Sequence, residues 1–310
     1  MRSRLVAAIC LAACVLAPAP AGAQPPAPVR VVVLVGGDSR SYASVLQGLQ
    51  EQLHLQAPAP AIEIFPLATT AVAAESALSR NAAPPAVVVA LGTAASALVR
   101  RSATPAPVVV GMVLREADVR ELPNATGVYL EFPVETELAW LRRVAPLNRH
   151  VGVVFSATNA ARVRQAVQLA ARSGLQLLPR EVRAPQEIPE ALRTLTDQAD
   201  ALWGLTDPIV YTPETAKTIL LFSVRNRIPF AGSSLPWVKA GALYAIDRDY
   251  RDVGRQCGEL AAALLGGQSP AALTPAPPRR VVWAVNRRTA EVMHLELAGE
   301  LVQGAAEVVP

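Results

Sequence analysis

The stretch VVVALGTAASALVRRSATPAPVVVG, residues 87–111, is repeated in outline by ALWGLTDPIVYTPETAKTILLFSVRNRIPFAG, residues 201–232. Each stretch has an apolar run, a short polar corner, a segment of helical spacing, a proline, and a second apolar run that ends in glycine. This order is typical of a strand–helix–strand unit in a parallel sheet. The corners at Gly92-Thr93 and Thr206-Asp207 therefore follow equivalent strands in two related halves. Open α/β sheets bind ligands at this edge, so facing halves would set the corners across a cleft.

The same alternation extends along most of the chain. Apolar, often β-branched runs are separated by amphipathic segments, as expected for strands covered on both faces. The predicted strands are residues 29–35, 61–67, 86–91 and 107–113 in the first half, and residues 150–155, 175–182, 199–205 and 228–232 in the second. The pattern predicts an α/β protein with two Rossmann-like lobes, each a parallel sheet flanked by helices.

The N-terminus predicts export. A basic start precedes the apolar run Leu5–Ala17, and the small residues Ala21–Ala23 give a cleavage site, so we expect residues 1–23 to be a signal peptide and residues 24–28 a Pro-rich linker. The alternative is a lipobox at Leu11–Cys14, with Cys14 as a lipid anchor. Both interpretations place the protein outside the cytoplasm, and we expect the periplasm.

Composition excludes several function classes. The chain has 310 residues, 52% apolar content and a formal charge of +4. Without the two leader arginines, 27 basic residues stand against 25 acidic ones, since two of the 29 are removed. The arginines are scattered and form no basic block, so we expect no nucleic-acid partner.

The common catalytic and metal-binding motifs are absent from the mature sequence. There is no nucleophile elbow, phosphate-binding loop, dinucleotide fingerprint or Cys-x-x-Cys pair. The histidines His54, His150 and His294 share no ligand spacing, and Cys257 lies on a small-residue helix face that favours a buried, inert thiol. We therefore expect no catalytic residue, no cofactor and no metal.

Short polar residues stand at the predicted corners. Asp207 has no histidine or second acid in its motif, so it is a poor general base; it either caps backbone N–H groups of its corner or accepts a hydrogen bond from a ligand. In GGDSR, residues 36–40, we expect a Gly-rich turn in which Asp38 or Ser39 caps the next helix. Thr93, Asn159, Ser233 and Ser234 lie at similar corners. Such a ring suits a small polar molecule that is held without being transformed.

A family resemblance is carried by PNATGVYLEFPVETELAWLRRVAPLNRHVGVVFSATN, residues 123–159. This segment resembles the inter-lobe segment of the ABC-transporter substrate-binding proteins of the type I periplasmic binding fold, in the group with tryptophan- and tyrosine-type binding proteins. The matching residues are Asn124, Thr126, Gly127, Pro146 and Gly152. The resemblance continues through residues 200–210, 227–267 and 285–295.

The resemblance implies two lobes joined by a hinge of three crossings. The first lobe would comprise residues 29–126 and about 246–273, and the second residues 127–245 and about 279–310. It also implies a monomer that captures a small polar solute, an amino acid or related molecule, and delivers it to an inner-membrane ABC permease.

By the same resemblance the solute would contact loops of both lobes, with Tyr129 and Trp237 as stacking groups. One departure is MVLREADV, residues 112–119, where many relatives have an Asp-Pro corner, so that Arg115 becomes a candidate partner for a carboxylate. The predicted ligand-binding residues are Gly37, Asp38, Ser39, Arg40, Gly92, Thr93, Ala94, Arg115, Tyr129, Ser156, Thr158, Asn159, Thr206, Asp207, Ser233, Ser234 and Trp237.

Two other functions stay open at this point. The same lobes could serve as a periplasmic sensing module that a membrane receptor reads. They could also form an extracytoplasmic α/β enzyme that uses Asp207 or Asp38.

Overall fold

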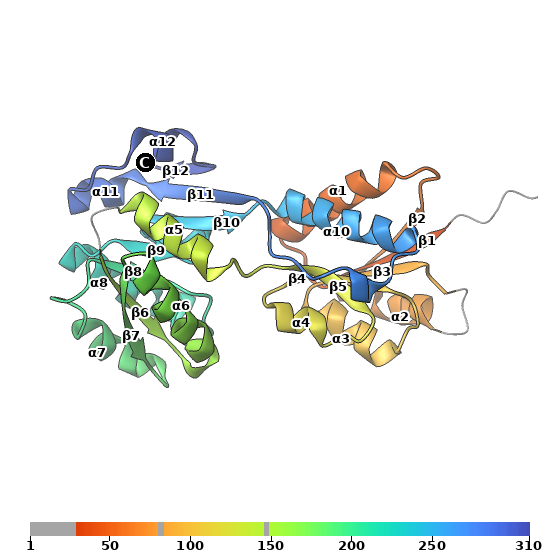
Figure 1. The fold of residues 1–310 in the computed structure, drawn as a ribbon, viewed down its shortest axis with the longest axis horizontal. Helices are drawn as coiled ribbons and strands as arrows, with labels where there is room; N and C mark the ends of the chain where they lie inside the picture. The colour runs from red at the N-terminus through yellow and green to blue at the C-terminus, as the bar shows by residue number, and fades with distance from the viewer. Residues whose placement is uncertain (1–28, 80–83, 146–148) are drawn as a thin grey trace, which may run out of the picture.

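The computed structural model describes residues 29–79, 84–145 and 149–310 and has two α/β lobes side by side along its long axis (Figure 1). The predicted signal peptide, the Pro-rich linker, the alternative anchor Cys14 and the family residue Pro146 lie outside the described residues. None of the described helices is long and apolar enough to cross a membrane.

The first lobe is built on a parallel sheet with the strand order β2-β1-β3-β4-β5. Its inner strands are runs of buried valine and leucine, because α1 and α10 cover one face and α2, α3 and α4 the other (Figure 1). The elements are β1 (Arg30–Val35), α1 (Arg40–His54), β2 (Ala61–Pro66), α2 (Leu67–Leu78), β3 (Val87–Leu91), α3 (Thr93–Ser102), β4 (Val108–Val113), α4 (Glu116–Arg120), β5 (Ala125–Tyr129), α10 (Tyr250–Leu265) and the 3-10 turn η3 (Pro270–Ala272).

Helices α1 and α10 lie unusually close together although about 200 residues separate them in sequence. A Cβ on Gly254 would lie 2.0 Å from the carbonyl oxygen of Val45, and one on Gly48 would lie 1.9 Å from the carbonyl oxygen of Arg251. Only glycine permits this approach, which lets α10 complete the first lobe after the chain has formed most of the second.

The second lobe has a seven-stranded sheet with the order β12-β11-β10-β9-β8-β6-β7. Helices α5 and α6 contribute to the core on one face, and α7 and α8 to the core on the other. The elements are α5 (Val134–Val144), β6 (His150–Phe155), η1 (Ala157–Asn159), α6 (Ala160–Arg172), β7 (Gln176–Glu181), η2 (Pro185–Glu187), α7 (Ile188–Arg193), β8 (Ala201–Trp203), α8 (Pro213–Asn226), β9 (Phe230–Gly232), α9 (Leu235–Ala240), β10 (Tyr244–Arg248), β11 (Val281–Asn286), α11 (Arg287–Met293), α12 (Gly299–Gln303) and β12 (Glu307–Val309).

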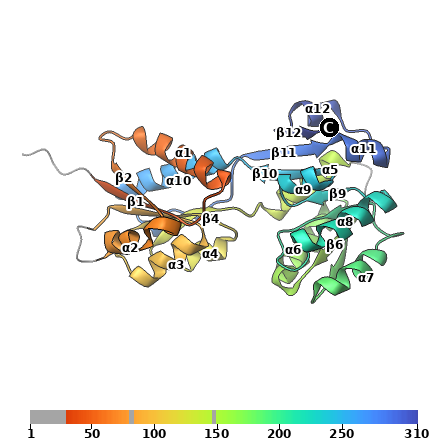
Figure 2. The same ribbon diagram turned by 180° about the vertical axis from the view of Figure 1, so that it is seen from behind.

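The second sheet is mixed, which corrects the prediction of two wholly parallel sheets. β11 is antiparallel to β10, while β12 is again parallel to β11. The reason is the chain path: β11 arrives from the first lobe and enters the second sheet in the direction opposite to β10, which leaves it (Figure 2).

Three crossings join the lobes: residues 130–133 between β5 and α5, residue 249 between β10 and α10, and residues 273–280 between η3 and β11. The predicted boundaries after residues 126 and 245 need correction. β5 pairs with β4 as far as Tyr129, and β10 pairs with β11 as far as Arg248, so the chain changes lobes about three residues later at both points. The second lobe's returning strand begins at Val281, two residues after the predicted start at 279.

Candidate functional site

The carboxyl edges of both sheets lie on the side of the crossings. The first crossing leaves from the carboxyl end of β5, which is parallel to its neighbour β4, and the second leaves from the carboxyl end of β10, which is parallel to β9. Since the crossings connect the lobes, each carboxyl edge lies toward the other lobe. This is the edge at which open α/β sheets bind ligands.

On the first lobe, the loops after β1 and β3 meet beneath the ring of Tyr42. A Cβ on Gly37 would lie 2.4 Å from Cε2 of Tyr42, and one on Gly92 would lie 2.3 Å from its hydroxyl oxygen. The backbone φ of Gly92 is +95°, which other residues rarely adopt. Tyr42 was not among the residues predicted for the site. Gly37 and Gly92 leave room for its ring, and they were the feature of the sequence that pointed to a close contact at these loops.

The polar residues that were predicted for these two loops are exposed. They are Asp38, Ser39, Arg40 and Thr93, together with Ala94. Ser39 takes the N-cap position of α1, as predicted, but its side chain makes no capping hydrogen bond. These side chains therefore stay available to solvent at the carboxyl edge of the first sheet.

Arg115 and Tyr129 have contacts within the first lobe. Arg115 precedes α4; its backbone N–H donates to Asp118 at 2.8 Å and its guanidinium donates to the same carboxylate at 3.3 Å. Tyr129 ends β5 and packs against the core beneath α2 and α3, where burial raises the pKa of its hydroxyl. The described contacts thus pair Arg115 with a carboxylate of its own helix.

On the second lobe, Asp207 is the centre of a buried hydrogen-bond network. One carboxylate oxygen accepts from the backbone N–H and the hydroxyl of Ser156 (2.8 and 2.9 Å) and from the Asn159 side chain (2.8 Å). The other accepts from the backbone N–H groups of Ile209 and Val210 (2.9 and 3.0 Å). Burial favours a raised pKa for Asp207, but these hydrogen bonds outweigh it and lower the pKa below its usual range. The carboxylate thus fixes two loops of the carboxyl edge, with Thr158 and Thr206 exposed beside it.

A pocket lies where the first and second crossings meet the second lobe, and we call it the hinge pocket. Its cavity volume is about 20 Å³, which is room for about one water molecule, and it opens to solvent. Its aromatic walls and polar groups come from the first crossing, α5, the carboxyl ends of β8 and β9, and the whole length of β10. These side chains are Phe132, Trp140, Trp203, Tyr244, Glu137, Ser233 and Arg248.

Of the hinge-pocket residues, only Ser233 was among the residues predicted from the sequence. A signal for Glu137 was present, because it lies on the same helical stripe as the buried residues Val134, Leu138 and Leu141 of α5. An acid on an apolar stripe is unusual unless it is paired or functional.

Glu137 is paired through one oxygen with Arg162 of α6. The guanidinium of Arg162 donates to Oε2 of Glu137 at 2.6 Å and to the carbonyl of Phe132 at 2.9 Å, and it lies 3.2 Å from the carboxylate of Glu131. Burial raises the pKa of Glu137 even though Arg162 opposes that shift. The arrangement connects the first crossing to the second lobe.

Arg248 connects the first two crossings. Its Nε donates to the carbonyl of Leu130 at 2.6 Å, its guanidinium lies 4.7 Å from the centroid of the Phe132 ring, and Nη1 is 3.6 Å from Asp247. Asp247 in turn accepts from the backbone N–H of Leu235, at the start of α9. The wall of the hinge pocket is therefore continuous with the hinge itself.

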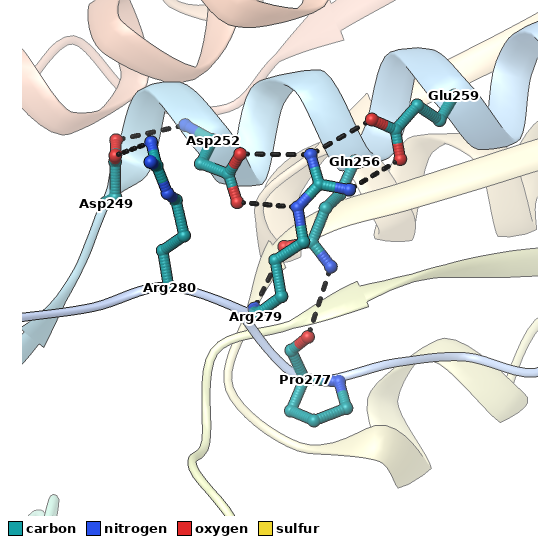
Figure 3. Close-up of polar contacts among 7 residues, drawn as sticks. All are labelled: Asp249, Asp252, Gln256, Glu259, Pro277, Arg279 and Arg280. Atoms are coloured by element: carbon teal, nitrogen blue, oxygen red, sulfur yellow. Dashed lines mark hydrogen bonds and ion pairs between the residues drawn. The ribbon is translucent and has the colours of Figure 1, made fainter.

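The third crossing is fastened to the first lobe through Arg279 (Figure 3). Its guanidinium donates to Asp252 at 2.9 and 3.0 Å and to Glu259 at 2.8 and 3.0 Å, and both acids lie on α10. Gln256, between them, accepts from the Arg279 backbone and donates to the carbonyl of Pro277. The crossing is thus held to α10 up to Arg279. The neighbouring Arg280 has longer contacts with Asp249: its guanidinium donates to the carboxylate at 3.5 Å, and its carbonyl accepts from the backbone N–H at 3.5 Å.

Trp237 lies in a different aromatic cluster from the hinge pocket. Its ring packs edge-on against Phe230 and Tyr211, with centroids 5.5 and 6.0 Å apart, and it lines a separate apolar groove between the starts of α8 and α9. Ser234 precedes α9 at the N-cap position without a side-chain capping bond. The predicted residues of the second lobe thus divide among the Asp207 network, the hinge pocket and this groove.

Cys257 is fully buried on α10, and burial raises the pKa of its thiol to about 12, in keeping with the predicted inert thiol. In the parts of the chain that the structure describes, no three His, Cys, Asp or Glu side chains are grouped to hold a metal ion.

A family model described as "ABC transporter substrate binding protein" matches residues 28–309, which include both lobes and all three crossings. The chain belongs to this family. The family consists of substrate-binding proteins, so the family and the two-lobed fold that the sequence predicted are both confirmed.

A curated relative is the tyrosine-binding protein of Clostridioides difficile (strain R20291), which is 23% identical over 152 residues. The match covers 47% of this chain and 43% of that relative, so the chain matches less than half of the relative's length.

Solved structures share the fold over nearly the whole chain. A substrate binding protein with adhesive properties from Clostridium difficile, in a ligand-free, open structure, has a TM-score of 0.75 at 17% identity, covering 90% of this chain and 99% of that one. An ABC domain from Streptococcus pneumonia in complex with L-Trp has a TM-score of 0.61 at 18% identity, covering 91% and 100%.

Proposed function

We propose that this chain captures a small polar solute, an amino acid or a related molecule, between its two lobes and delivers it to an inner-membrane ABC permease. The observation that carries the proposal is that the carboxyl edges of both sheets lie on the side of the crossings. The hinge pocket lies beside the first and second crossings. The relatives that bind tyrosine and L-Trp support an amino-acid solute.

Capture would proceed by closure of the lobes about the crossings. The lobes are well separated in Figures 1 and 2, and the higher TM-score is the one against the open, ligand-free structure. A solute held on one carboxyl edge would stabilise the closed form through contacts with the other edge, which is how a ligand shifts a hinge equilibrium.

We propose binding without chemical change. Asp207, the acid that an enzyme would most readily use here, has both oxygens filled by protein hydrogen bonds, and Cys257 is buried with a raised thiol pKa. Such groups hold structure and have little capacity to transfer protons or attack a substrate.

The predicted site residues and cellular context remain part of the proposal. The exposed loops at Gly37–Arg40 and Gly92–Ala94 would meet the solute from the first lobe, and Ser233 would meet it from the second. The leader sequence supports a protein of the periplasm, with the anchor at Cys14 as the alternative, and the scattered basic residues support the absence of a nucleic-acid partner. The family resemblance supports a monomer.

Titration calorimetry with the twenty amino acids, nucleosides and small carboxylic acids tests this function. We expect one chemical class to bind with a micromolar or tighter Kd, and Ser233→Leu, which places bulk in the hinge pocket, to weaken it. The matched control is Ser76→Leu on the exposed face of α2. Absence of heat and of a thermal shift with every solute would contradict the proposal.

A further inference from the structure

The first crossing passes from one lobe to the other between Glu131 and Phe132. Leu130 and Glu131 still belong to the first lobe, because their backbone N–H groups donate to carbonyl groups at and just after the end of β4, at 2.8 and 2.9 Å. Phe132 belongs to the second lobe: its ring lies in that lobe's core, and its carbonyl accepts from Arg162 of α6 at 2.9 Å. The backbone between Glu131 and Phe132 is therefore where this crossing turns when the lobes move relative to each other.

Two arginines reach back across this turning point from different parts of the second lobe. Arg248 ends β10 beside the second crossing, and its Nε donates to the carbonyl of Leu130 at 2.6 Å. Arg162 comes from α6, which is part of neither crossing, and its guanidinium lies 3.2 Å from the carboxylate of Glu131. A hinge axis that passes through both crossings leaves the Arg248 contact nearly in place, whereas the Arg162 contact joins the first lobe to the body of the second.

Arg162 has two further partners that stay with it in every arrangement of the lobes. Glu137 of α5 accepts from its guanidinium at 2.6 Å, and the carbonyl of Phe132 accepts at 2.9 Å. Both partners lie in the second lobe, so both contacts persist when the lobes turn. Arg162 is 14% exposed and Glu137 balances its charge, so separation from Glu131 leaves no unpaired cation in a largely buried place. Of the three contacts, the one with Glu131 depends on the position of the first lobe.

The ion pair is placed to hold the separated arrangement of Figure 1. The side chains of Arg162 and Glu131 are 14% and 25% exposed, so their charges attract each other more strongly than at an open surface. The pair joins a residue anchored to the first lobe to a helix of the second. The ion pairs of the third crossing instead run from Arg279 to α10 of the first lobe, so they move with that lobe and do not resist a turn (Figure 3).

We propose that the Glu131–Arg162 ion pair is a latch that stabilises the separated lobes and is broken when they close on a solute. The inference rests on the proposed function, since it concerns the regulation of capture in the same cleft. A solute that binds the closed form must overcome the stabilisation of the separated form, and its apparent affinity is lower by that factor. Dissolved salt screens the pair, so the latch also makes capture depend on ionic strength.

Distances between the lobes in the solute-free protein test the latch without any ligand. Spin labels on the exposed residues Ser76 of α2 and Gln165 of α6 place one label on each lobe. Cys257 is buried and stays unlabelled, and the two cysteines of the leader are replaced by serine. Pulsed electron–electron double resonance then measures the distribution of label distances, in which closed molecules are distinguished from separated ones.

The test variant is Glu131→Gln, which nearly keeps the size of the side chain and removes its charge. The matched control is Glu135→Gln, an exposed acid in the first turn of α5 that is not among the described partners of Arg162. We expect Glu131→Gln to raise the closed fraction at least about threefold and Glu135→Gln to leave it unchanged, since only the first removes the latch. The same distance distribution in the wild type and in Glu131→Gln would overturn the inference.

Calorimetry gives a second readout that a purely structural role would not move. L-tryptophan and L-tyrosine are the probes, and we expect Glu131→Gln to bind them about three- to tenfold more tightly than the wild type. Raising sodium chloride from about 0.05 to about 0.5 M should tighten binding by the wild type and leave Glu131→Gln unaffected. Equal or weaker binding by Glu131→Gln, or an equal response to salt, would contradict the latch. If no solute of the wider panel binds, the proposed function fails, and the label distances still decide whether the latch exists.

Discussion

Replacing Asp207 by asparagine should destabilise the second lobe strongly. The carboxylate is the acceptor in all five of its hydrogen bonds, three at one oxygen and two at the other. An asparagine amide presents one oxygen and one NH2 group. In either orientation at least two N–H groups therefore lose their acceptor and face another donor.

The magnitude follows from those lost acceptors. A buried donor left without a partner costs about 1–3 kcal/mol, so two such donors give an expected loss of about 2–6 kcal/mol in the free energy of unfolding. The native pKa of Asp207 is lowered, so its stabilising effect is present above the unfolded pKa of about 3.9 and is lost as the pH falls through the native value. The difference between wild type and Asp207→Asn should thus narrow below about pH 4.

Urea unfolding followed by tryptophan fluorescence measures this lobe specifically. All four tryptophans, at positions 140, 203, 237 and 283, belong to the second lobe, whereas circular dichroism reports both lobes. The matched control is Asp197→Asn, an exposed acid of the same lobe. A loss below about 1 kcal/mol for Asp207→Asn at pH 7 would refute the reasoning.

Three further predictions concern the first lobe and the hinge. Gly254→Ala places a Cβ against backbone and should lower the melting temperature of the first lobe by several degrees in calorimetry, whereas Gly299→Ala, with no atom within 4 Å, should not. Arg279→Ala should speed hydrogen exchange in the third crossing at least about threefold, and Arg280→Ala should leave it nearly unchanged; equal effects would contradict the anchoring role. Cys257 should resist a thiol reagent at pH 8 until denaturant is added, and rapid labelling of the native chain would show that it is accessible.

The lobes were predictable because their signals are local and repeated. Buried strands such as Val87–Leu91 are runs of apolar, largely β-branched residues. The helix between two such strands follows a glycine or a polar corner in the sequence. β5 was missed because Ala125–Tyr129 is short, contains Gly127 and gains its strand character only by pairing with β4. β10, β11 and β12 were not predicted as strands, and the antiparallel direction of β11 depends on the path of the third crossing and not on its own residues.

The site was predictable only in part, because its position follows from local sequence patterns but its contacts join residues that are far apart in the sequence. Loop position follows from strand order, so the corner at Asp207 could be placed at the carboxyl edge. Which partners fill its carboxylate depends on Ser156 and Asn159, about fifty residues away in sequence. The hinge pocket joins Glu137 to Tyr244, over a hundred residues apart, and neither carries a local motif.

The central claim is that two lobes close on a solute between their carboxyl edges. Small-angle X-ray scattering, with and without a saturating amount of the solute that calorimetry identifies, tests it most directly. The account predicts a smaller radius of gyration in the bound state, because the separated lobes of Figure 1 come together. A solute that binds tightly and leaves the scattering curve unchanged would contradict it.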